Sequence, residues 1–203
     1  MLAEARRLGF LGPGPVATHL DHAAGFAEAM ERGLNGEAAS ERRAVDLGSG
    51  GGVPGLPLAL RFSVWSWALI DSSVRRTGFL RDAVRSLGLE DRVRVISDRA
   101  EAVGRNPTDR SSFDVVVARS FGPPAVVAEC AAPLLRPNGL AVVSEPPGGV
   151  SDRWPAAGLA VVGMTPDQSV SARGWAYQLL RQSESCPQRY PRRVGVPTKR
   201  PLF

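Results

Sequence analysis

From residue 42 onward, the chain alternates short apolar runs with longer amphipathic stretches. Five apolar runs have the length and the β-branched or aromatic content of buried strands: 42–47, 64–70, 92–97, 113–118 and 140–144. Three segments between them are expected to form helices, and in the longest the apolar residues share one helical face: 53–60, 72–87 and 123–135. Strands that alternate with helices predict an α/β fold with a mostly parallel sheet and right-handed crossovers.

The two ends of the chain follow other patterns. Residues 1–40 are polar and helical in character, and Thr18 is the expected cap of a helix over 19–30. Near the other end, the apolar runs 159–164 and 175–182 have no convincing helix between them, so we expect an antiparallel hairpin at the sheet edge. These patterns predict a single domain over 1–203, which consists of an N-terminal helical extension (1–40), an α/β core (41–185) and a C-terminal tail (186–203).

Composition narrows the class of protein. Hydrophobic residues make up 43% of the 203 residues and charged residues 22%, as in ordinary globular domains. No apolar run approaches the roughly 18 residues that a membrane span needs, and the first residues lack the apolar core of a secretory signal. Cys130 and Cys186 are too few for a disulfide framework or a zinc cluster. We therefore expect a cytoplasmic protein with no metal ion and no membrane partner.

Positive charge gathers at the C-terminus. The formal net charge is +5, and the segment 189–203 contains no acidic residue and five basic ones: Arg189, Arg192, Arg193, Lys199 and Arg200. Such a segment is attracted to polyanions. Its prolines suit an extended strand that lies along RNA phosphates, and the alternative is a solubilising end without a partner.

A glycine-rich loop follows the first expected strand. Read from Gly50, the residues GGGVPG fit the dinucleotide pattern G-x-G-x-x-G; read from Asp46, the residues DLGSGGG resemble the first motif of class I S-adenosylmethionine methyltransferases, D-x-G-x-G-x-G. A carboxylate at the strand end would repel the pyrophosphate of a dinucleotide, whereas it suits the ammonium of S-adenosylmethionine. The second strand also ends in an acid, Asp71, which could accept the ribose hydroxyls of either cofactor. A tight turn without a ligand is the third interpretation.

Longer segments of the chain are similar to one family. The stretches VDLGSGGGVPGLPLAL, LIDSSVRRTGFLRDAVRSLGL, SDRAEAV, FDVVVARSF and RYPRRVGVPTKRPLF occur in the order found in the RsmG/GidB family, bacterial enzymes that methylate N7 of a guanine in 16S rRNA. The resemblance implies a class I, Rossmann-like methyltransferase fold and S-adenosylmethionine as the cofactor. It also implies 16S rRNA or the small ribosomal subunit as the partner.

The resemblance further implies the residues of the site. The cofactor would be bound by Asp46, Gly48, Ser49, Gly50, Gly52, Leu56, Asp71, Ser72, Arg99, Ala100, Glu101 and Arg119. Arg119 is also the candidate catalytic residue, because it follows a buried strand at the sheet edge where ligands bind in this fold class. The RNA would be bound by Arg75, Arg76, Arg189, Arg192, Arg193, Lys199 and Arg200. Guanine N7 carries a free lone pair, so no general base is expected, and His19 and His22 are interpreted as surface or capping groups.

Three positions depart from the family pattern. Thr18 stands in the place of a family arginine, His22 in the place of an aspartate, and Glu145 near the place of a lysine. These changes remove positive charge and add a negative one, which should weaken phosphate binding. Two alternatives therefore remain beside rRNA methylation. One is a divergent methyltransferase that acts on another RNA or a small molecule, and the other is a non-catalytic RNA-binding protein that retains the fold.

Overall fold

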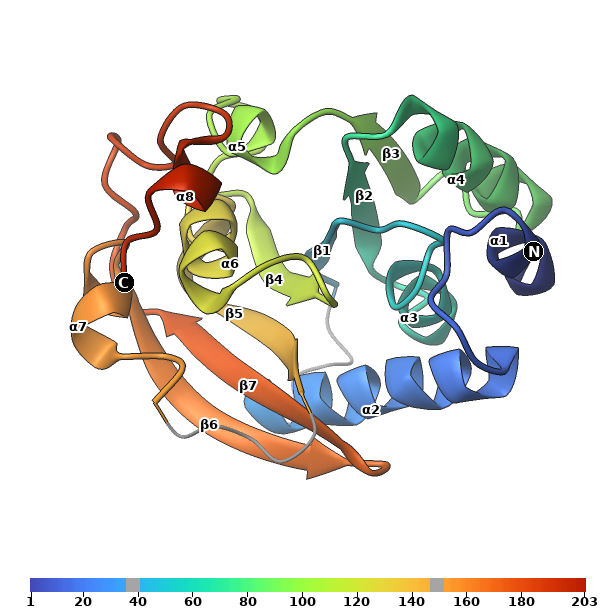
Figure 1. Cartoon of the computed structure of the whole chain (residues 1–203), viewed down its shortest axis with the longest axis horizontal. Helices are drawn as coiled ribbons and strands as arrows, with labels where there is room; N and C mark the ends of the chain where they lie inside the picture. The colour runs from blue at the N-terminus through green and yellow to red at the C-terminus, as the bar shows by residue number, and fades with distance from the viewer. Residues whose placement is uncertain (36–40, 147–151) are drawn as a thin grey trace.

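A single twisted sheet forms the centre of the molecule. This computed structural model describes residues 1–35, 41–146 and 152–203. Its strands are β1 (Arg43–Leu47), β2 (Ser66–Asp71), β3 (Val93–Ser97), β4 (Phe113–Ala118), β5 (Leu135–Glu145), β6 (Met164–Ala172) and β7 (Trp175–Gln182). They lie in the order β3-β2-β1-β4-β5-β7-β6 (Figure 1).

The sheet is parallel from β3 to β5, and β7 pairs antiparallel with both β5 and β6. This arrangement confirms the predicted α/β fold with an antiparallel edge. The chain runs from β1 outward to β2 and β3 and then returns to place β4 on the other side of β1. Ligands of open α/β sheets bind at the carboxyl ends of the strands beside such a reversal. A ligand site is therefore expected at the carboxyl ends of β1 and β4.

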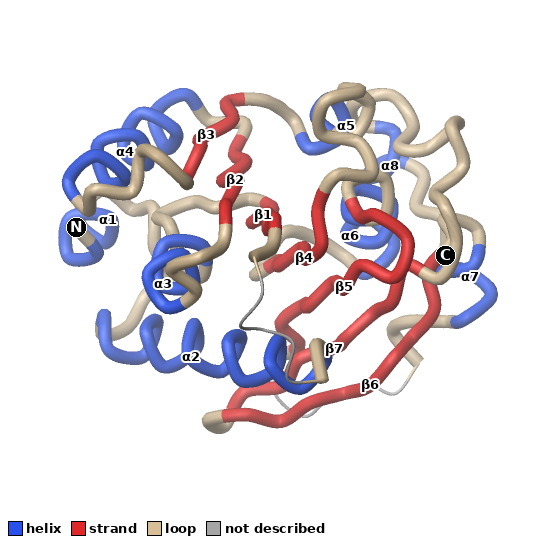
Figure 2. The backbone as a smooth tube through the Cα atoms, turned by 180° about the vertical axis from the view of Figure 1, so that it is seen from behind, coloured by secondary structure: helices blue, strands red, loops and turns tan. Residues whose placement is uncertain are grey.

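Helices cover both faces of the sheet (Figure 2). Residues of α2 (Val16–Gly33), α3 (Gly55–Arg61) and α4 (Val74–Ser86) pack into one core with the sheet, and α1 (Leu2–Arg7) lies beside α2. On the other face, α5 (Ala100–Val103), α6 (Pro124–Ala131) and α7 (Ala156–Ala160) share a second core, and α8 (Val196–Lys199) lies against α6. In the described ranges, no helix has the length and apolar content needed to cross a membrane.

The predicted strand at 159–164 is wrong. Its apolar side chains belong to the short helix α7 and the turn after it, where Leu159 and Val162 fill the second core, and β6 begins only at Met164. A short apolar run cannot be assigned to strand or helix by periodicity alone. The predicted hairpin itself is confirmed as β6 and β7. Their connection is Arg173-Gly174, both with positive φ, as a tight two-residue hairpin turn requires.

Two expectations at the chain ends are also wrong. Thr18 does not cap α2, because the helix begins at Val16 with Pro15 as its N-cap and without a side-chain cap. Proline is tolerated at this position because the N-cap precedes the helix, so its missing N–H removes no hydrogen bond within the helix. The C-terminal tail is not an extended arm. It folds onto α5 and α6 and contains α8.

Candidate active site

Two adjoining cavities lie at the carboxyl ends of the parallel strands. The first, of about 230 Å³, reaches from Asp71 to Ala100 and Phe121. The second, of about 410 Å³, lies between the glycine loop and the N-terminal segment. Gly48, Arg76 and Ser120 line both cavities, so the two spaces meet at the glycine loop. An elongated ligand could occupy the first and reach into the second.

The glycine loop is held by backbone hydrogen bonds to the end of β2. Ser49 N–H donates to the carbonyl of Ile70 at 2.9 Å, and Gly50 N–H donates to Oδ2 of Asp71 at 2.9 Å. Gly48 has a φ of 71°, and a Cβ added there would lie 2.8 Å from the Phe121 ring. A side chain at this position would be strained and would collide with the wall of the first cavity. Glycine is therefore required for the loop to pass so close to the ring.

Asp71 lies on the wall of the first cavity and is only 5% exposed. Its Oδ1 accepts a hydrogen bond from Ser73 N–H at 2.9 Å, its Oδ2 accepts the bond from Gly50, and the Arg76 guanidinium lies 3.6 Å away. A carboxylate has about four lone-pair sites. Two backbone donors thus fix its orientation while further acceptor capacity remains for a ligand.

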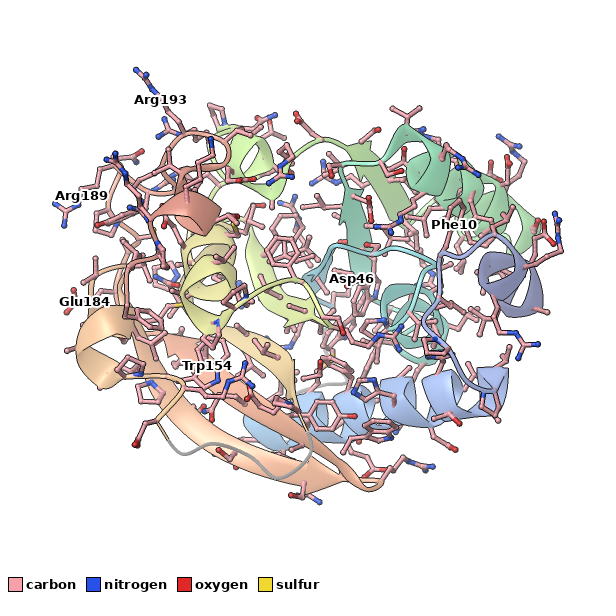
Figure 3. The ribbon with its side chains drawn as sticks, viewed as in Figure 1. Phe10, Asp46, Trp154, Glu184, Arg189 and Arg193 are labelled. Atoms are coloured by element: carbon pink, nitrogen blue, oxygen red, sulfur yellow. The ribbon has the colours of Figure 1, made fainter. Side chains whose placement is uncertain are left out.

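Asp46 lies beneath the glycine loop rather than on the wall of either cavity (Figure 3). It is 1% exposed; Oδ2 accepts from Gly55 N–H at 3.1 Å, and Oδ1 is buried without a hydrogen-bond partner among the described residues. Burial raises the pKa of this carboxyl to about 7. Gly52, in the loop itself, packs against the buried Leu56. None of these three predicted cofactor residues is among those that line the two cavities.

Arg119 and His19 meet across the second cavity, although they are 100 positions apart in sequence. Arg119 Nη1 lies 3.2 Å from His19 Nδ1, and His19 Nε2 lies 3.2 Å from the carbonyl of Gly12. A carbonyl can only accept, so Nε2 carries the proton and Nδ1 accepts from the guanidinium. Burial lowers the pKa of Arg119, and the Asp46 carboxylate partly opposes this shift. The interpretation of His19 as a surface or capping group is wrong.

His22 also borders the second cavity and is 8% exposed. Its ring centroid lies 4.4 Å from that of Trp175, and its Nε2 is buried without a partner in the described part of the chain. Burial, together with the charge of Arg119, lowers the pKa of His22 to about 4. His22 is therefore neutral at pH 7, and its interpretation as a surface group is wrong too.

The negative charge of Glu145 is neutralised inside the protein. Its Oε2 lies 3.0 Å from Arg153 Nη1, and its Oε1 accepts a hydrogen bond from Trp154 Nε1 at 2.9 Å. The departure from the family lysine at this position thus brings no free carboxylate to the surface. The residues that follow from 147 to 151 lie outside the described part of the chain.

The other predicted site residues fall into three places. Six of the predicted cofactor residues line the first cavity: Gly48, Asp71, Ser72, Arg99, Ala100 and Glu101. Gly48, Ser49, Gly50 and Arg119 line the second. Among the predicted RNA-binding residues, Arg76 borders both cavities, Arg75 lies over the Phe10 ring at 5.9 Å, and four are exposed on the tail: Arg189, Arg193, Lys199 and Arg200. Arg192 is instead held by the buried Glu129.

Several wall residues were missed by the sequence prediction. Ser120 and Phe121 directly follow Arg119 in the segment FDVVVARSF, so their place after a buried strand was an available signal. Phe10, Trp175 and Thr198 come from segments far from the sheet edge in sequence. Only the fold brings these three to the cavities.

Comparison with known proteins identifies the family. Residues 29–145 match the GidB family, described as rRNA small subunit methyltransferase G. The chain belongs to this family. The ribosomal RNA small subunit methyltransferase G of Prochlorococcus marinus (strain MIT 9313) is 40% identical over 172 residues, which cover 81% of this chain and 70% of that protein. The protein of the same name from Rubrobacter xylanophilus is 35% identical and covers 100% of this chain and 80% of its own length.

Solved structures share the fold of this GidB-family chain. A SAM-dependent methyltransferase from Aquifex aeolicus aligns with a TM-score of 0.61 at 15% identity over 89% of this chain and 97% of that one. An RNA methyltransferase from Salinibacter ruber, solved with S-adenosyl-L-homocysteine, aligns with a TM-score of 0.58 at 17% identity over 87% of this chain and 97% of that one. The predicted class I methyltransferase fold is confirmed.

Proposed function

We propose that this chain is an S-adenosylmethionine-dependent methyltransferase that acts on N7 of a guanine in small-subunit (16S) rRNA. The observation that carries the proposal is the pair of cavities that meet at the glycine loop, in a chain that belongs to the GidB family. The relatives at 35–40% identity are named as methyltransferases of ribosomal small-subunit RNA.

The residues of the site fit the methyl donor. The first cavity offers the Asp71 carboxylate to a ribose and a partly apolar wall that includes Phe121. At the junction, Gly50 leaves the backbone open: a Cβ built there would meet only backbone oxygens, at 3.4 Å and beyond. Below the loop, Asp46 keeps a buried oxygen without a partner among the described residues. A cationic ammonium above this loop would be attracted by that carboxylate, whereas a pyrophosphate would be repelled.

The chemistry needs alignment more than proton transfer. When bound, S-adenosylmethionine would supply a methyl group carried on a sulfonium: a bond from N7 to the methyl carbon would form as the carbon–sulfur bond breaks, which leaves a neutral thioether and a cationic base. No proton has to be removed from N7, so neither His19 nor His22, which both line the second cavity, is needed as a general base. The task of the protein is therefore to hold the base in line with the methyl group.

Arg119 is the candidate for this orientation. Its guanidinium is partly buried on the wall of the second cavity, next to the junction with the first. Arginine pairs well with the O6 edge of guanine, which lies beside N7. His19 acts as a positioning residue, because its bond to Gly12 fixes the tautomer that accepts from Arg119.

The exposed basic residues supply the RNA side of the proposal. Arg76 borders both cavities, and Arg189, Arg193, Lys199 and Arg200 lie on the surface of the tail. Contacts from such residues to phosphates position the RNA without reading its sequence. The pairing of Glu145 with Arg153 neutralises the negative charge that stands near the place of the family lysine.

Methylation of purified small subunits tests the proposal. Subunits from a strain that lacks the gene would be incubated with the protein and a labelled methyl donor, and the modified base would be mapped by mass spectrometry. We expect one N7-methylguanine in 16S rRNA. Arg119→Met, which keeps most of the side-chain volume and removes the charge, is the matched variant and should bind the donor while losing transfer.

The other results separate the alternatives. Donor binding without label in any ribosomal RNA would reject the rRNA substrate and favour another RNA or a small molecule. If calorimetry detects no binding of S-adenosylmethionine, the enzyme proposal fails and RNA binding without catalysis remains.

A further inference from the structure

The C-terminal segment 189–200 is attached to the sheet domain by an ion pair between the partly exposed Arg192 and a buried carboxylate. Glu129 of α6 is 0% exposed, and its two oxygens accept hydrogen bonds from the Arg192 side chain at 2.8 Å and 2.6 Å. The backbone N–H of Arg192 also donates to Glu129, at 2.8 Å. The guanidinium in turn donates to the carbonyl of Arg200 at 2.6 Å, which closes the segment into a loop. A buried carboxylate without its partner would be costly, so this attachment is a built part of the fold.

A second attachment lies at the wall of the first cavity. Gly195 N–H donates to Oε1 of Glu101 at 3.0 Å, and the same oxygen accepts from Arg99 Nη2 at 3.2 Å. Glu101 is 3% exposed and lines that cavity together with Arg99. One carboxylate therefore joins the cavity wall to the C-terminal segment.

The segment itself reaches the cavity. Thr198, on the short helix α8, lines the first cavity together with Asp71 at the end of β2 and Ser120 just after β4. In sequence, this helix follows all seven strands of the sheet. Part of the cavity wall is thus supplied by an exposed residue from outside the parallel sheet and its helices.

We propose that the C-terminal segment is part of the methyl-donor site and that Thr198 contacts the adenosine end of the bound donor. The assignment of that end rests on the proposed function, in which Asp71 of the same cavity accepts the ribose and the glycine loop holds the amino-acid end. The segment that supplies Thr198 to the donor pocket then also contains three exposed basic residues: Arg193, Lys199 and Arg200. The tail serves the donor site as well as the RNA.

The experiment replaces Thr198 with a bulky side chain that fills the first cavity, and measures the binding of two ligands. S-adenosylhomocysteine contains both ends of the donor, and 5′-methylthioadenosine contains the adenosine end alone. Calorimetry should show that Thr198→Trp weakens both ligands by a similar factor of about tenfold or more, because the indole occupies their shared space. Val194→Trp is the matched control, since Val194 is 55% exposed on the same segment, and it should leave both affinities unchanged.

If the indole of Thr198→Trp turns outward, it would not block the cavity. A second measurement therefore tests whether a bound ligand protects residue 198 from chemical modification. Cys130 and Cys186 are buried, and burial raises the pKa of both thiols, so neither should react readily with a thiol reagent. In Thr198→Cys, saturating S-adenosylhomocysteine should slow the alkylation of the new thiol several-fold, whereas in Val194→Cys the rate should not change.

The two proposals fail in different ways. If the wild type binds both ligands but Thr198→Trp binds them equally well and Thr198→Cys is not protected, the contact is refuted while the methyltransferase proposal stands. If the wild type binds neither ligand, the proposed function fails, and this inference fails with it.

Discussion

Replacing Asp46 with asparagine should make the protein more stable at high pH relative to the wild type. In the folded state the carboxyl is buried with a pKa of about 7, compared with 3.8 as the reference value. An acid with a raised pKa binds its proton more tightly in the folded state, so its contribution to the free energy of unfolding falls as the pH rises from about 4 through 7. Asparagine cannot ionise, so the variant escapes this loss.

The magnitude follows from the two pKa values. Linkage gives an ionisation cost of about 3 kcal/mol at pH 6 and about 4 kcal/mol at pH 8, so the advantage of Asp46→Asn should grow by roughly 1 kcal/mol between these pH values. The hydrogen bond from Gly55 can be kept by the amide oxygen, and any cost of the buried amide N–H₂ is the same at both pH values. The growth of the difference is therefore the quantity to measure.

Urea unfolding at pH 6 and pH 8 measures it. Asp82→Asn, on the exposed face of α4, is the matched control and should differ from the wild type by the same amount at both pH values. The reasoning is refuted if the Asp46→Asn difference stays constant, because the carboxylate would then be ionised without penalty. A second readout is S-adenosylhomocysteine affinity, which should fall in Asp46→Asn, because the loop would lose the charge that attracts the ammonium.

Three other predictions follow from the site and its surroundings. Asp71→Ala should weaken S-adenosylhomocysteine binding by about 10- to 100-fold in calorimetry, because a ribose acceptor is lost and Gly50 N–H loses its partner; unchanged affinity would reject the ribose assignment. His22 has a folded pKa of about 4, below its usual 6.5, so the folded state resists protonation and stability falls as the pH drops from 6.5 towards 4. His22→Phe should remove about 2 kcal/mol of the loss that urea unfolding records between pH 8 and pH 5, and an unchanged loss would contradict the burial of a neutral ring. Replacing Arg189 and Arg193 with serine should reduce the salt dependence of RNA binding by up to about two units of log–log slope, while an identical slope would exclude both from the interface.

Much of the fold could be predicted because its signals are local. The runs that became β1, β2 and β4 are buried and apolar along most of their length, and strands covered on both faces need that composition. The glycines after β1 must be in the sequence, because a conformation with positive φ at Gly48, Gly50 and Gly52 disfavours other residues. The order of these elements was enough to predict the parallel sheet and the edge at which a ligand would lie.

The sequence pattern gave a wrong prediction where a short apolar run is compatible with either a strand or a helix. The run that includes Leu159 and Val162 is apolar enough for a strand, but it became a helix and a turn because that arrangement fills the space beside α6. The basic tail had no apolar periodicity, so its docking on Glu129 was not visible in the sequence. In both segments, the conformation depends on contacts with buried residues of a segment that is distant in sequence.

The sequence alone determined the class of the protein: an α/β sheet, a glycine loop suited to S-adenosylmethionine, and acids at two successive strand ends. Only the tertiary structure decided what each residue does there. It put Asp46 beneath the loop, joined His19 to Arg119, and brought Thr198 to the wall of a cavity that begins at Asp71. The physical reason is that strand and loop preferences arise from neighbours along the chain. Burial, pKa and the walls of a pocket depend on which distant segments pack together once the sheet has formed.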